Sequence, residues 1–160
     1  MRKKIYLKII ELLVEGELIK HVDLWNENIQ YITEEQAWST PAVFVEFEPI
    51  IWMPFPGGVQ EGTVTVRLHI ITRCIEPTND SSPYKDSALA YLDMLDSINS
   101  RIHGFSGDGF NTFTRKQSVT NHNHEELVES IETFSVHVID ASSSSEVQMI
   151  EAPRTVQIQL

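Results

Sequence analysis

The residues best placed to do chemistry in this 160-residue sequence are the histidines of a polar segment, residues 120–126. His122 and His124 are two positions apart, so on an extended chain both side chains point the same way and can share a metal ion. Asp140 is the residue that would complete a set of three ligands for metal-dependent hydrolysis. A solvated connection between two strands explains the segment more simply, because no further ligand is indicated. His122 and His124 are the candidates for a metal site, but no metal or other cofactor is expected.

Other reactive residue types lack the surroundings that catalysis requires. Cys74 is the single cysteine, and its place near the end of a predicted strand indicates a small core residue. Asp93 and Asp96 are three positions apart on a predicted helix, which makes them surface neighbours rather than a pair in a cleft. The sequence contains neither a Gly-x-Ser-x-Gly motif nor a phosphate-binding glycine loop. The sequence therefore predicts that the protein is not an enzyme.

The composition indicates one globular domain with an acidic surface. Apolar residues make up 41% and charged residues 22% of the chain, which is ordinary for a globular protein. The formal net charge of −11 disfavours binding to DNA phosphates and to anionic membranes, because both require clustered Lys and Arg. No apolar run approaches the length of a membrane span, and acidic residues interrupt the N-terminal segment where a signal peptide would be apolar. The chain is expected to be intracellular when made.

A long helix over residues 83–103 is the element around which the predicted fold is organised. Its apolar residues recur with the 3.6-residue period of a helix that lies on a sheet: Tyr84, Ala88, Tyr91, Leu92, Leu95, Ile98 and Ile102. Alternating apolar residues predict strands at residues 42–48, 63–75, 110–119 and 127–140, a further strand is possible at 20–26, and residues 2–19 predict an amphipathic helix. The expected fold is α+β: a mainly antiparallel sheet of about four or five strands, packed by an N-terminal helix and one long central helix.

One apolar segment, residues 50–62, fits no regular element. Its large apolar side chains include Trp52, Met53 and Phe55, but two prolines and two glycines argue against a central strand. Two arrangements fit this composition. The segment either folds back over the core or protrudes as an arm towards another subunit, where it would form an interface.

The C-terminal residues are predicted to stand apart from the domain. Four consecutive serines indicate a flexible linker, so the chain is divided into a domain, residues 1–141, and an arm, residues 142–160. The last residues alternate in polarity and include Val156 and Ile158. They are compatible either with a disordered tail or with a strand added to the sheet edge of a neighbour.

The order of these elements, rather than a chemical motif, carries a family resemblance. The segments are a strand PAVFVEF at residues 41–47, a strand TVTVRLHIIT at 63–72, a helix ending in His-Gly at 84–104, and a hairpin at 113–140. Together they resemble the tail-terminator, or tail-completion, family of long-tailed phages and prophages, over about residues 1–141. The segment 52–58 and the serine-linked C-terminus depart from the family pattern, so the resemblance does not define their contacts.

The resemblance implies a structural role in a virion. Members of the family form a ring, usually hexameric, that caps the tail tube, ends its polymerisation and presents a surface to the head connector. It implies no catalysis and no cofactor, passage of DNA without specific binding, no membrane, and a location in the virion tail after assembly in the host cytoplasm. The alternative is another head–tail adaptor or connector, or a tail-tube subunit. The residues expected at oligomer or partner contacts are Trp52, Met53, Phe55, Val156 and Ile158.

Overall fold

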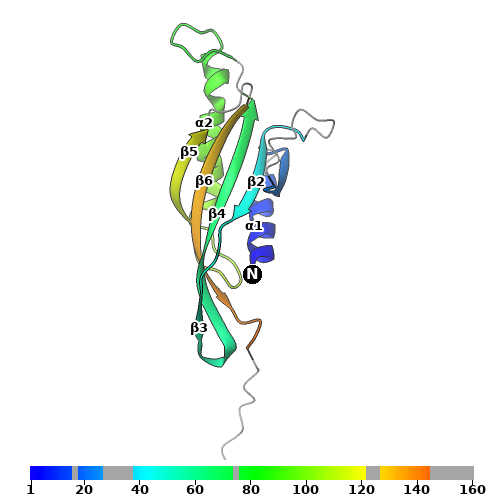
Figure 1. The fold of residues 1–160 in the computed structure, drawn as a ribbon. Coiled ribbons are helices and arrows are strands. Elements are labelled where there is room, and N and C mark those ends of the chain that lie inside the picture. Colours follow the sequence, from blue (N-terminus) through cyan, green and yellow to red (C-terminus); the bar gives the residue numbers. More distant parts are fainter. Residues whose placement is uncertain (16–17, 27–37, 74–75, 122–126, 145–160) are drawn as a thin grey trace, which may run out of the picture.

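The computed structural model describes residues 1–15, 18–26, 38–73, 76–121 and 127–144. Within these ranges the chain forms one sheet with two α-helices, α1 and α2 (Figure 1). The elements in chain order are α1 (Arg2–Val14), β1 (His21–Leu24), β2 (Ala42–Phe47), β3 (Trp52–Phe55), the short 3-10 turn η2 (Pro56–Gly58), β4 (Val59–Arg73), α2 (Lys85–Ile102), β5 (Thr114–Asn121) and β6 (Leu127–Asp140).

The sheet is built on the pairing of its two longest strands. β4 and β6 are antiparallel, and their register runs from Gln60 opposite Asp140 to Arg73 opposite Leu127. The strand order is β1-β2-β4-β6-β5, with β3 also paired to β4. Only β1 and β2 are parallel among the described strands. β2 and β3 follow one another along the same edge of β4.

The two helices cover the same face of this sheet. The apolar residues of β4 that alternate from Val64 to Ile70 are fully buried and share one core with Ile5 and Ile9 of α1 and Ile98 of α2. Successive side chains of a strand point to opposite faces, so the other set of β4 residues lies on the face away from the helices. We call this second surface the open face.

The predicted number of strands is wrong. The expected sheet had about four or five strands under an N-terminal helix and one long central helix, whereas the described sheet has six. The additional strand is β3, in the segment for which prolines and glycines argued against a strand. Proline lacks a backbone N–H, but an edge strand tolerates it. Pro54 lies in β3, whose only pairing among the described strands is with β4.

An ion pair and a hydrogen bond to one buried carboxylate hold the edge strand β5 to the sheet. Glu132 of β6 is only 1% exposed. Its Oε2 accepts hydrogen bonds from Arg115 Nε and from Ser118 Oγ, both at 2.6 Å. A carboxylate this deeply buried needs such partners, because burial of an unpaired charge is costly.

Candidate functional site

The part of the sheet that extends beyond the helices is a narrow ribbon of three strands. It contains β3, the first residues of β4 and the last residues of β6, and Figure 1 shows the β3–β4 hairpin projecting past the N-terminal end of α1. The register of pairing with β4 changes between β2 and β3. Phe47 of β2 pairs with Val66, whereas Trp52, five residues later, pairs with Gly62, which is only four residues from Val66. We call these three strand segments the ribbon.

Three large apolar side chains lie exposed on the open face of the ribbon. Met53 is opposite Glu61, which is opposite Ile139, so these residues form one row across the three strands. Phe55 lies two positions along β3 from Met53 and therefore on the same face. Met53, Phe55 and Ile139 are 54%, 58% and 50% exposed. We call them the ribbon patch.

The predicted interface residues of this segment are divided between two faces. Met53 and Phe55 belong to the ribbon patch, while Trp52 pairs with Gly62 and packs, half-buried, against the main core. Trp52 therefore fixes the ribbon to the domain, and its neighbours Met53 and Phe55 are exposed. Ile139 was not among the predicted residues, although the alternation of its strand places it away from the core. The segment combines features of both arrangements: Trp52 packs on the core, while Met53 and Phe55 are exposed on the projecting hairpin, and its role as an interface stays a prediction.

The opposite end of the open face is covered and rich in paired charges. Phe44 and Ile71 are fully buried there beneath Trp25 and Trp38. The ring centroids of Trp38 and Phe44 are 4.8 Å apart with their planes at 73°. These contacts close this end of the face.

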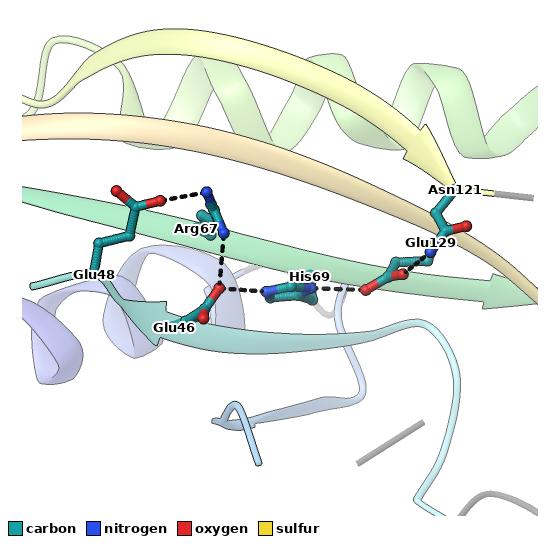
Figure 2. Close-up of polar contacts among 6 residues, drawn as sticks. All are labelled: Glu46, Glu48, Arg67, His69, Asn121 and Glu129. Carbon is teal, nitrogen blue, oxygen red and sulfur yellow. Dashed lines mark hydrogen bonds and ion pairs between the residues drawn. The ribbon is translucent and has the colours of Figure 1, made fainter. Parts of the chain in front are cut away.

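His69 is the centre of a chain of polar contacts at the covered end (Figure 2). Its Nδ1 lies 2.7 Å from an oxygen of Glu129, and its Nε2 lies 3.1 Å from an oxygen of Glu46. Both ring nitrogens of His69 are therefore in contact with a carboxylate. The ring of Trp25 stacks on that of His69 at 3.8 Å.

The same chain of contacts joins four strands of the sheet. Arg67 of β4 lies 2.5 Å from Glu48, which follows β2, and 3.6 Å from Glu46 of β2. At the other end, Asn121 of β5 donates a hydrogen bond of 2.8 Å to Glu129 of β6. His69 and Glu129 are 5% and 4% exposed. Their burial indicates that this histidine–carboxylate group stabilises the fold and does not meet a substrate.

Several charged residues lie beside the ribbon, near the N-terminus of the chain. A hydrogen bond from Lys4 lowers the pKa of the Asp108 carboxyl. The pKa of Asp140 is also lowered, first by the backbone N–H of Ser142. Between α1 and the loop after α2 lies an open groove of about 440 Å³, lined by Lys4, Leu7, Lys8, Glu11, Phe105, Ser106, Gly107, Asp108 and Phe110. Its charged side chains are paired with one another, Lys4 with Asp108 and Lys8 with Glu11.

Several sequence-predicted residues lie outside the described residues: His122, His124, Cys74, Val156 and Ile158. In the ranges that the structure describes, no three His, Cys, Asp or Glu side chains are grouped so as to hold a metal ion. Asp93 and Asp96 are both exposed on α2. None of the helices in the described part of the chain is long and apolar enough to span a membrane.

Comparisons with known proteins identify a fold but no family. No family model matches the sequence. No curated protein matches it either. Among solved structures, a chain of the "Virion of native gene transfer agent (GTA) particle" is similar, with a TM-score of 0.50 and 10% sequence identity. The match covers 86% of this chain and 97% of that chain. At this identity the similarity establishes that the two chains share a fold.

Proposed function

We propose that this chain is a structural subunit of a phage-like virion, and that within the virion it is a tail terminator. The observation that carries the proposal is the fold shared with a chain of a gene transfer agent virion over 97% of that chain. The arrangement of sequence elements that resembles the tail-terminator family supports the same role. The protein assembles into a ring, a hexamer, that caps the tail tube and joins it to the head connector. It acts without catalysis and without a cofactor.

The ribbon patch supports contact with another virion protein. Met53 and Phe55 are more than half exposed, although they belong to a strand that is held to the domain by Trp52. Covering such side chains on assembly removes apolar area from water and favours association by about 25 cal/mol for each Å² buried. We assign the ribbon patch to the contact with the tail tube. Val156 and Ile158 remain proposed as further contacts.

The charge of the chain suits a channel through which DNA passes. Six copies carry 66 formal negative charges, six times the −11 of one chain. A surface of this sign repels phosphates and lets DNA pass without specific binding. It also disfavours anionic membranes, in agreement with a location in the virion tail after assembly in the host cytoplasm.

The oligomeric state of the purified chain tests this proposal. Size-exclusion chromatography with light scattering is expected to give a particle of about 110 kDa, six times 18.3 kDa, alone or with tail tubes as a template. Negative-stain electron microscopy is expected to show closed rings. A chain that stays monomeric at high concentration and leaves supplied tubes uncapped contradicts the proposal. Open-ended tubes made of this chain alone would instead identify a tail-tube subunit.

A further inference from the structure

The chain leaves the sheet at the tip of the ribbon. β6 ends at Asp140, and in the turn that follows, the backbone N–H of Ser144 donates a hydrogen bond of 3.0 Å to the carbonyl of Ala141. This turn packs on the β3–β4 hairpin, since the backbone carbonyl oxygen of Ser143 lies 2.5 Å from the position that a Cβ on Gly58 would occupy. Figure 1 shows the chain passing beside this hairpin after β6. The C-terminal segment therefore starts next to the ribbon.

The segment after this turn is long enough to reach any part of the ribbon. It consists of residues 145–160, which lie outside the described residues. Its last part, residues 155–160, alternates in polarity, and we call it the terminal stretch. The linker before it, residues 145–154, spans up to about 33 Å when extended, whereas the four residues of β3 span about 14 Å. The terminal stretch can therefore reach the ribbon of its own chain.

The apolar side chains of the terminal stretch match those of the ribbon patch in spacing. In an extended chain Val156 and Ile158 project from one side, two positions apart. Met53 and Phe55 have the same spacing on one face of β3, and the described residues leave them 54% and 58% exposed. Pro54 lacks a backbone N–H, so β3 is a poor template for a further strand. The match therefore lies in the side chains, whose contact removes apolar area from water.

We propose that the terminal stretch of each free chain covers the ribbon patch of the same chain, and that the tail tube displaces it. A linker of about ten residues holds the terminal stretch near its own ribbon at an effective concentration of about 1 mM, which favours this ribbon over that of another copy. The contact is weak, because the tube must replace it. Its release frees Val156 and Ile158 for other contacts. The inference rests on the proposed function and describes how its tube contact is regulated.

Methyl NMR of the free chain tests this contact directly. In a Cys74→Ser background, a nitroxide spin label is attached to Gln159→Cys, on the polar side of the terminal stretch, and the methionine methyl groups are labelled with ¹³C. The signal of Met53 is expected to broaden. The signal of Met94 is expected to stay sharp, because Met94 lines a groove with Thr72, at the end of β4 away from the ribbon. A sharp Met53 signal overturns the proposal.

A mixed sample distinguishes the chain's own terminal stretch from that of another copy. Spin-labelled chains without ¹³C are mixed in urea with ¹³C-labelled chains that carry no spin label, and the two are refolded together. The Met53 signal is expected to stay sharp, because each terminal stretch returns to its own ribbon. Broadening in this sample would show that the terminal stretch lies on the ribbon of a second copy, and it would overturn the proposal.

Two double variants test which side of the terminal stretch makes the contact. V156D/I158D is expected to restore the sharp Met53 signal in the spin-labelled chain, because carboxylates are costly to bury against apolar side chains. T155D/Q157D is the matched control, since it adds the same charges to the other side of the stretch, and it is expected to keep the broadened signal. Equal spectra for the two variants would overturn the proposal.

Binding to tail tubes tests the regulatory role. In co-sedimentation, V156D/I158D is expected to bind tubes about fivefold more tightly than the wild type, the gain expected when a contact with a Kd of about 0.25 mM competes at an effective concentration of about 1 mM. T155D/Q157D is expected to bind as the wild type does. Equal or weaker binding by V156D/I158D would overturn the regulation. If no chain binds tubes, the proposed function fails, while the methyl signals of the free chain still decide whether the terminal stretch covers the ribbon patch.

Discussion

The two ends of the open face both contain β4 and β6, but their apolar side chains differ in burial. At one end, Phe44 and His69 are buried under Trp25. At the other, Met53 and Phe55 are exposed on the ribbon. The covered end buries its apolar groups and pairs its charged groups within the chain, whereas the ribbon leaves large apolar side chains exposed. Under the proposed function, stability and partner binding depend on different ends of one surface, so substitutions are expected to separate them.

Phenylalanine truncation at the two ends is the largest expected contrast. Phe44→Ala removes a fully buried ring from contact with Trp38 and is expected to cost about 3–5 kcal/mol of unfolding free energy. Phe55→Ala removes a ring that is 58% exposed and is expected to change that free energy by less than about 0.5 kcal/mol. Chemical denaturation of both monomeric variants measures the difference. Equal losses would show that the ribbon contributes to folding as the covered end does.

His69 and His137, at the two ends of the open face, give a second matched pair. His69→Ala removes the imidazole that contacts the buried carboxylate of Glu129 and is expected to cost about 3 kcal/mol. His137 lies 3.6 Å from Glu61 near the ribbon, and its side chain is 39% exposed. His137→Ala is therefore expected to cost less than about 1 kcal/mol. Urea unfolding compares the two variants, and a small loss for His69→Ala would mean that the charge network does not stabilise the fold.

Charged substitution of the ribbon patch is expected to separate folding from binding. In M53D/F55D, both new carboxylates remain in water, so the free energy of unfolding is expected to change by less than about 1 kcal/mol. Binding to tail tubes is expected to be lost, because the same carboxylates would be buried in the contact. Co-sedimentation with assembled tubes measures binding. M53L/F55L, which keeps the patch apolar, is the control and is expected to sediment with the tubes.

The smallest expected effect concerns the exposed ion pair beside the ribbon. Lys4→Ala is expected to raise the pKa of Asp108 towards its ordinary value, because the hydrogen bond from Lys4 lowers it. A lowered pKa stabilises the fold above the ordinary aspartate pKa, and this contribution is lost as the pH falls through the pKa of the folded state. The pair is exposed to water, so no measurable change in stability is expected. Carboxyl-detected NMR titration follows Asp108; an unchanged pKa would contradict the assignment.

The elements that the sequence predicts are those with a strong local period. β4 and β6 alternate in polarity along most of their length, and α2 keeps the 3.6-residue period between its ends, so these elements follow from local patterns. β3 does not follow from a local pattern, because Pro54 is unfavourable in most strands and is tolerated here only at the edge of the sheet. The number of strands was therefore underestimated.

The candidate site depends on register and helix placement, which local patterns do not contain. Met53 and Phe55 were predicted from their apolar type, but their separation from Trp52 follows from pairing with β4. Ile139 joins the ribbon patch only because Glu61 lies opposite both Met53 and Ile139. Leu92 has the period of a buried residue, and it is exposed because the core packs against a neighbouring side of α2.

The length of tail tubes is the most direct test of whether this chain ends tail-tube polymerisation. A tail-tube protein is assembled alone, with the wild-type chain, and with M53D/F55D, and tube lengths are measured by negative-stain electron microscopy. If the chain is a tail terminator, the wild type stops elongation and leaves a ring at one tube end. Tubes assembled with M53D/F55D are then as long as tubes of the tube protein alone. Tubes that elongate equally with and without the wild-type chain, and carry no terminal ring, would show that the chain is not a tail terminator.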